Sequence, residues 1–287
     1  MNKYTGIFPA LVTPYKSNGK INEESLQKII NLNLDKGVKG FYIGGSTAEA
    51  FLLSMDERKY ILDIVAQECK GKCTLISHIG SIGTEHAVEL GKYSEALGYD
   101  AISSVAPFYY KFSFEEIKNY YFDIVNNVNL PMIIYNFPAF SGVTFNMSNI
   151  KEFMNDERFI GIKHTSYDLY QLEQMLKIDE RLTVFNGHDE VFLGALAMGA
   201  KSAIGSTFNF MSEKFIKIDK LFKEGNISEA QEVQAKANEI IDALIKVGVN
   251  QGVKYALEIQ GIECNGSRRP FRSLTEDDKK LLEKILE

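Results

Sequence analysis

A lysine closes a short apolar segment in the middle of the chain, FIGIKHT (Phe159–Thr165). A lysine at the end of a buried strand must lose hydration or gain a partner, and either change shifts its pKa. Where burial lowers that pKa, the neutral amine of Lys163 can attack a carbonyl carbon and form a Schiff base. The alternative is that the strand ends one residue early and leaves Lys163 in water, where most lysines are found.

A Schiff-base lysine needs a proton carrier and a group that holds the substrate. Tyr135, in PMIIYNFP (Pro131–Pro138), has a phenol that can relay protons in both directions, unless it is only a core tyrosine. Ser46 and Thr47 follow two glycines in GGST, and their hydroxyl and N–H groups suit a carboxylate. Ordinary turn chemistry explains these two residues equally well.

Asp189 and Glu190, in NGHDE, could accept hydrogen bonds from a polyhydroxy substrate. The alternative is that they are first-turn acids that complement the dipole of the helix that follows. The chain has four histidines and three cysteines, and neither set has the spacing of metal ligands. The sequence therefore predicts no catalytic metal, and it predicts reduced thiols in a cytoplasmic protein.

The candidate residues lie near the ends of short apolar segments, each closed by Gly, Pro, Ser or Asn. Such segments are typical of buried parallel strands. The predicted strands lie within Gly6–Pro14, Lys39–Thr47, Cys73–Gly80, Asp100–Pro107, Pro131–Pro138, Phe159–Thr165, Leu182–Asp189 and Lys201–Phe208. Helical patterns separate them. Asn22 and Gly37 mark the two ends of one helix, and Ser54–Glu57 and Ser113–Glu116 form capping boxes that begin two more.

Eight strand-helix units predict an α/β fold, a (β/α)8 TIM barrel over residues 1–225. Residues 226–287 carry helical patterns alone and are expected to form a C-terminal helical extension packed on the barrel, as one structural unit. An open doubly wound sheet is the alternative, but no GxGxxG follows the first strand. In a barrel the strands' carboxyl ends form the mouth. Because Gly161, Lys163 and Thr165 share one face of their strand, Lys163 would rise into that mouth.

Composition limits the possible functions. A hydrophobic content of 45%, a charged content of 24% and a net charge of -6 are those of an acidic globular protein, which argues against a nucleic-acid surface. The opening segment lacks the apolar core of a signal peptide, and no run reaches membrane-spanning length. We expect a cytoplasmic protein with no nucleic-acid or membrane partner.

The chain resembles the pyruvate-dependent class I aldolases of the N-acetylneuraminate lyase and dihydrodipicolinate synthase superfamily. The resemblance covers nearly the whole chain, and its motifs occur in order: GGSTAEAFLLSMDER, APFYY, YNFP and GIKHTS. It implies that Lys163 is the Schiff-base lysine, that Tyr135 is the general acid/base, and that Ser46 and Thr47 hold the substrate carboxylate. It also implies a homotetramer, in which Tyr109 of APFYY reaches the proton relay of a neighbouring subunit.

Within the superfamily the chain resembles the sialic acid branch. Dihydrodipicolinate synthases usually carry an arginine after the tyrosine motif, where this chain has Phe140. The motif NGHDE resembles the lyase pattern. The resemblance implies that the sugar tail is contacted by Thr165, Gly187, Asp189, Glu190 and Ser206.

The implied reaction is reversible cleavage of a small-molecule substrate, N-acetylneuraminate, to N-acetylmannosamine and pyruvate, with no metal or organic cofactor. Two alternatives stay open: another pyruvate-dependent aldolase, such as dihydrodipicolinate synthase or a 2-keto-3-deoxy sugar acid aldolase, and a barrel that binds a sugar or keto acid without catalysis. One position departs from the motif, because Ala48 replaces the usual glycine. If that position requires a positive φ, alanine adds strain there.

Overall fold

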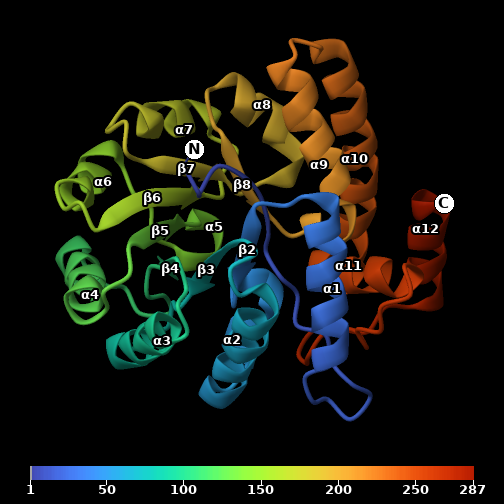
Figure 1. Ribbon diagram of the computed structural model, residues 1–287, viewed down its shortest axis with the longest axis horizontal. Helices are drawn as coiled ribbons and strands as arrows, with labels where there is room; N and C mark the ends of the chain where they lie inside the picture. Colours follow the sequence, from blue (N-terminus) through green and yellow to red (C-terminus); the bar gives the residue numbers. More distant parts are fainter. Residues whose placement is uncertain (1) are drawn as a thin grey trace.

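Eight parallel strands form a barrel at the centre of the molecule, as a computed structural model describes it for residues 2–287 (Figure 1). The strands are β1 (Gly6–Pro9), β2 (Gly40–Ile43), β3 (Thr74–His78), β4 (Ala101–Val105), β5 (Met132–Asn136), β6 (Phe159–His164), β7 (Thr183–Asn186) and β8 (Ser202–Gly205). Each lies inside a segment predicted from the sequence. The strands are shorter than those segments, because the polar residues that close each segment belong to the loops.

Neighbouring strands pair in the order β1-β8-β7-β6-β5-β4-β3-β2. A parallel bridge between Ala10 and Tyr42 joins the two ends of this order, together with a hydrogen bond from the backbone N–H of Leu11 to the carbonyl of Tyr42 at 3.0 Å. The sheet therefore curls back on itself. The predicted barrel is confirmed, and the open doubly wound alternative is wrong.

Alternation along each strand separates two apolar cores. One core fills the barrel interior and includes Phe8, Tyr42, Tyr135 and Phe185. The larger core lies between the strands and the surrounding helices. The side chains of this inner core lie directly below or beside the residues at the carboxyl ends of the strands.

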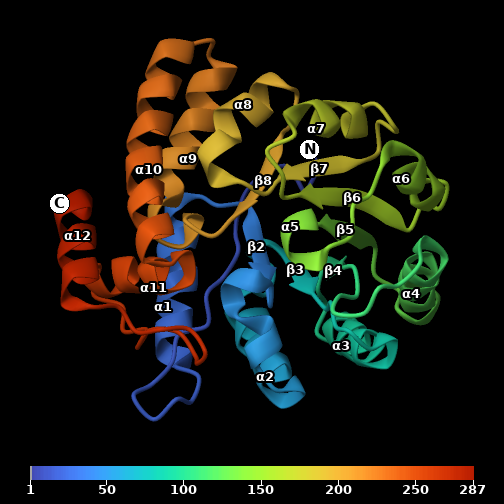
Figure 2. The same cartoon turned by 180° about the vertical axis from the view of Figure 1, so that it is seen from behind.

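Helices follow the strands and cover the barrel from outside (Figure 2). They are α1 (Glu23–Lys36), α2 (Met55–Cys69), α3 (Thr84–Ala96), α4 (Phe114–Asn127), α5 (Pro138–Ser141), α6 (Met147–Met154), α7 (Leu169–Leu176), α8 (Phe192–Ala197) and α9 (Phe208–Lys223), with short 3-10 turns η1 (Ser46–Ala48), η2 (Ala50–Leu52) and η3 (Asp189–Val191). The predicted caps of α1 are present: the side chain of Asn22 accepts the N–H of Ser25, and Gly37 is left-handed with φ 90°. Both predicted capping boxes form, at Ser54 and at Ser113.

Three helices follow α9 and complete the chain: α10 (Ile227–Val247), α11 (Val249–Ile259) and α12 (Glu276–Leu286). The long helix α10 lies beside α9, and α11 and α12 lie against α10 on the same side of the barrel (Figures 1 and 2). None of the helices among residues 2–287 is long and apolar enough to cross a membrane.

Candidate active site

Lys163 lies at the carboxyl end of β6, inside the barrel. Its residue surface is 5% exposed, and its Cα is paired across the sheet with that of Tyr135 on β5. Two positions below it on the same face, Gly161 leaves no room for a side chain, because a Cβ there would lie 2.5 Å from the carbonyl oxygen of Thr183. The crowded interior therefore directs Lys163 upward into the mouth, and the solvated alternative for this lysine is wrong.

The amine of Lys163 is held between two aromatic rings. Its Nζ lies 4.1 Å from the ring centre of Tyr135 and 4.3 Å from that of Tyr42. Burial lowers the pKa of Lys163 to about 7, and the carboxylate of Asp189 partly opposes this change. Near neutral pH a large share of the amine is therefore unprotonated and able to act as a nucleophile.

Tyr42 was missed by reasoning from the sequence. It lies on β2 and points into the barrel, where its hydroxyl donates to Oγ of Ser103 at 3.1 Å. Alternation in GFYIGG could have placed it on the inner face, but which side chains face one another across a barrel depends on the register of distant strands.

Tyr135 lies beside the lysine with its ring buried. Burial raises the pKa of Tyr135 to about 12, and the neighbouring hydroxyls of Ser46 and Thr165 oppose part of that rise. The phenol is therefore protonated at neutral pH, and it can give up its proton only while receiving another. A phenol in this state is better suited to relaying a proton than to acting as a free base.

Ser46 and Thr47 begin the η1 turn at the carboxyl end of β2. The hydroxyl groups of Thr47 and Ser206 are 2.7 Å apart, which links the loops after β2 and β8. Ser46 also lines a cavity of 620 Å³ at the mouth. The remaining walls of that cavity include aromatic side chains and part of the C-terminal region: Phe51, Phe108, Phe137, Phe140, Gly248, Val249, Asn250, Gln251, Pro270 and Phe271.

Thr165 and Gly187 meet at the ends of β6 and β7. The Oγ1 atom of Thr165 is buried near the phenol of Tyr135, but it makes no well-formed hydrogen bond among residues 2–287, so it is available to a ligand. A Cβ on Gly187 would lie only 2.0 Å from this oxygen. The glycine therefore preserves the position of the threonine hydroxyl.

The change Gly187→Ala is expected to displace the Thr165 hydroxyl and to raise the substrate KM by about 10-fold or more, through loss of one well-placed hydrogen bond. Steady-state kinetics will measure this. Gly83→Ala is the matched control, since a Cβ there meets its nearest neighbour at an ordinary 3.6 Å. Equal kinetics in the two variants would contradict this role of Gly187.

Asp189 is buried at the start of the η3 turn and takes part in the site. Its Oδ2 atom accepts the N–H of Thr207 at 2.9 Å and the hydroxyl of Thr207 at 2.7 Å. Burial raises the pKa of Asp189 to about 6, and these two hydrogen bonds oppose the rise. The carboxylate thus holds the loop after β8, while Asp189 and Glu190 also lie in the first turn of η3, as the alternative reading predicted.

Glu190 is held at the rim by two residues that the sequence did not single out. Its Oε1 atom accepts the hydroxyl of Tyr167 at 2.6 Å and lies 3.4 Å from Nδ1 of His188. The rings of Tyr167 and His188 are stacked 4.2 Å apart. The hydrogen bonds from His188 and Tyr167 outweigh burial and lower the pKa of Glu190.

Two predictions about the neighbouring motifs have different outcomes. The strain expected at Ala48 is absent, because the left-handed residue is the next one, Glu49, with φ 60°. Within this chain Tyr109 does not join the other candidate residues. It is 84% exposed, it also has a positive φ of 80°, and its ring packs edge-on against Tyr110.

The amine of Lys163, the phenol of Tyr135 and several hydroxyl groups thus lie together at the mouth of the barrel. Comparison with known proteins shows which family has this arrangement. The model of the dihydrodipicolinate synthetase family matches residues 3–287. The chain belongs to this family. Among residues 2–287, no group of three or more His, Cys, Asp or Glu side chains could hold a metal ion.

Relatives within the dihydrodipicolinate synthetase family point to one branch. The chain is 42% identical to "N-acetylneuraminate lyase 2" of Escherichia coli, over 99% of this chain and 94% of that protein. The crystal structure of CdNal from Clostridium difficile in complex with mannosamine has a TM-score of 0.95 and 43% identity, and covers 98% of each chain. N-acetylneuraminate lyase from Fusobacterium nucleatum complexed with pyruvate has a TM-score of 0.94 and 38% identity, with 99% and 96% covered.

Proposed function

We propose that the protein is a class I aldolase that cleaves N-acetylneuraminate reversibly to N-acetylmannosamine and pyruvate. The observation that carries the proposal is the buried amine of Lys163, 4.1 Å from the ring of Tyr135, with its pKa lowered to about 7. A protein that only binds its ligand has no need of such an amine. The named relatives support the choice of substrate.

Schiff-base formation is the first step. The neutral amine of Lys163 attacks the C2 ketone of the open-chain sugar acid, and loss of water gives an iminium ion. Ser46 and Thr47 would hold the substrate carboxylate beside the lysine. The sugar tail would extend past Thr165 and Gly187 toward Asp189, Glu190 and Ser206, whose oxygens can accept or share its hydroxyl protons.

Bond cleavage follows from the positive charge on the iminium nitrogen. The Tyr135 relay, acting through the substrate carboxylate, removes the proton of the C4 hydroxyl. The C3–C4 bond then breaks and its electron pair moves to the iminium nitrogen, which releases N-acetylmannosamine and leaves an enamine. Protonation at C3 and hydrolysis release pyruvate and restore Lys163. The water released when the Schiff base forms is taken up again in this hydrolysis, so the cycle consumes no net water, and it needs no metal or organic cofactor.

Paired assays test the substrate. We expect pyruvate release from N-acetylneuraminate, and no condensation of pyruvate with aspartate semialdehyde, because Phe140 offers no charge to a second carboxylate. Condensation with the semialdehyde but no cleavage of the sialic acid would favour a dihydrodipicolinate synthase. A thermal shift with N-acetylneuraminate but no product would favour a binding barrel without catalysis.

The pH dependence of Schiff-base formation is a further expectation. With a Lys163 pKa of about 7, trapping of pyruvate by borohydride should rise as pH passes through about 7 and then level off. The Asp189 carboxylate favours the ammonium form, so Asp189→Asn should move this rise to lower pH. An unmoved rise, or one moved to higher pH, would contradict the coupling. Glu276→Gln, at an exposed site on α12, is the control.

We propose that the protein is a cytoplasmic homotetramer in which Tyr109 completes the relay of a neighbouring subunit. The exposed ring of Tyr109, which follows the cavity-lining Phe108 in the chain, supports this assembly. We also propose that residues 1–225 and 226–287 act as one structural unit. Light scattering on the purified protein will test the tetramer.

A further inference from the structure

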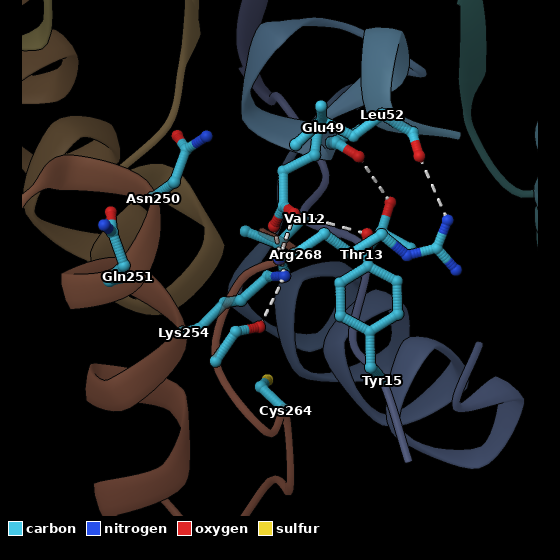
Figure 3. A network of polar contacts seen from close by, with 12 residues as sticks. Val12, Thr13, Tyr15, Glu49, Leu52, Asn250, Gln251, Lys254, Cys264 and Arg268 are labelled. Carbon is cyan, nitrogen blue, oxygen red and sulfur yellow. Dashed lines mark hydrogen bonds and ion pairs between the residues drawn. The ribbon is translucent and has the colours of Figure 1, made fainter. Parts of the chain in front are cut away.

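A buried ion pair connects the C-terminal helices to the loop that carries Ser46 and Thr47. Glu49 is the residue that directly follows η1, and Lys254 comes from α11 (Figure 3). Both side chains are fully buried, and they contact each other directly. Nζ of Lys254 also donates to the carbonyl of Gly266 at 2.8 Å and lies 4.2 Å from the ring centre of Tyr15.

The Glu49 carboxylate has further partners that fix its place. Its Oε2 atom accepts the backbone N–H of Arg268 at 2.7 Å and the hydroxyl of Tyr15 at 3.4 Å. The backbone of Glu49 is left-handed, with φ 60° and ψ 33°, a conformation that residues with a Cβ seldom adopt. Surrounding contacts must hold a residue in that conformation, and the Lys254 pair is the strongest of them.

The same region of the chain also fixes the backbone on either side of Glu49. Nδ2 of Asn250, on α11, donates to the carbonyl of Ser46 at 3.4 Å. Nη1 of Arg268 donates to the carbonyl of Leu52 at 3.1 Å (Figure 3). From the barrel side, Thr13 donates its hydroxyl to the carbonyl of Ala48 at 2.8 Å. With the contact between Thr47 and Ser206, the segment from Ser46 to Leu52 is thus attached at five residues. Three of them, Ser46, Glu49 and Leu52, contact α11 or the loop between α11 and α12.

A buried ion pair is a weak source of stability, because an apolar pair of similar volume often stabilises a fold as well or better. Its directional contacts, however, select one geometry. We infer that Glu49 and Lys254 are positioning residues, which set the hydroxyl groups of Ser46 and Thr47 for the pyruvyl carboxylate. The C-terminal extension thereby becomes part of the support of the active site. This inference rests on the proposed function and goes beyond it.

The test uses three variants of the full-length protein: Lys254→Met, Glu49→Gln and the double variant. Each single change leaves one buried group without its partner, so the double variant keeps the test valid if a single variant fails to fold. Lys36→Met is the matched control. It removes a partly buried ion pair with Glu213 at the C-terminal end of α1, the end that leads into β2.

Half-saturation by pyruvate is measured through borohydride trapping, and the KM values of pyruvate and N-acetylmannosamine are measured in the synthetic direction. In the folded double variant we expect both the half-saturation concentration and the KM of pyruvate to rise by about 10-fold or more. The KM of N-acetylmannosamine should stay within about twofold of the parent value, because Asp189 and Glu190 are untouched. Lys36→Met should change neither.

Two kinetic results would overturn the inference: an unchanged half-saturation concentration and KM of pyruvate in the folded double variant, or an equal rise in the KM of both substrates. A double variant that does not fold would also overturn it, because the pair would then be a general stability element. Trapping needs only pyruvate, so it still reports on carboxylate positioning if N-acetylneuraminate proves not to be the substrate. Failure of the substrate assignment appears instead as an inactive parent protein that still traps pyruvate.

Discussion

Replacing Lys163 by alanine is expected to abolish turnover, with a loss of about 10⁴-fold or more, as is typical when a covalent nucleophile is removed. The reason is geometric as well as chemical. Lys163 is the lysine whose amine lies between the rings of Tyr42 and Tyr135 inside the barrel. Steady-state assays of pyruvate release will measure the effect, and borohydride should no longer trap an adduct.

Two further variants separate chemistry from packing. Lys163→Met keeps most of the side-chain volume and should lose activity as completely as the alanine variant, with an unchanged circular dichroism spectrum. Lys201→Ala removes an exposed lysine just before β8 and should keep parental activity. Substantial turnover in Lys163→Met would show that another group performs the covalent step.

Replacing Tyr135 by phenylalanine is expected to lower kcat by about 10²–10⁴-fold, the usual contribution of a positioned proton carrier. The ring and its contact with Lys163 remain, so Schiff-base formation with pyruvate should persist at Lys163. The defect should therefore appear in cleavage and not in trapping. Comparing kcat with the yield of the trapped adduct will distinguish these steps.

Tyr99→Phe is the control for loss of a buried phenol. The Tyr99 hydroxyl donates to the carbonyl of Leu62 at 3.0 Å, in the layer between barrel and helices. Its removal should cost some stability, about 1 kcal/mol, without a comparable loss of kcat. If both phenylalanine variants lowered kcat equally, Tyr135 would have no special role in proton transfer.

Most of the fold could be predicted from the sequence because its signals are local. Apolar segments closed by turn residues located every strand, and Asn22, Ser54 and Ser113 each cap the helix that the sequence assigned to them. Parallel strands in a barrel bring their carboxyl ends together. Lys163 and Tyr135 could therefore be placed in one site although 27 residues separate them.

The parts that sequence reasoning missed depend on contacts between distant segments. Tyr42 contacts the lysine only because β2 and β6 face each other across the interior. Lys254 pairs with Glu49 from 205 positions away, and no periodicity signals such a partner. The strain expected at Ala48 was wrong by one residue, because the turn places its left-handed backbone at Glu49. The proposed role of Tyr109 depends on a neighbouring subunit and stays a prediction.

The central claim is that Lys163 forms a Schiff base with a sialic acid and that this sugar is then cleaved. The most direct test is borohydride reduction with N-acetylneuraminate as the sole ligand, followed by peptide mass mapping. The account predicts a pyruvyl-sized adduct on Lys163, since no pyruvate is supplied and only cleavage can generate it. An adduct on another residue, or no adduct under conditions where free pyruvate is trapped, would contradict it.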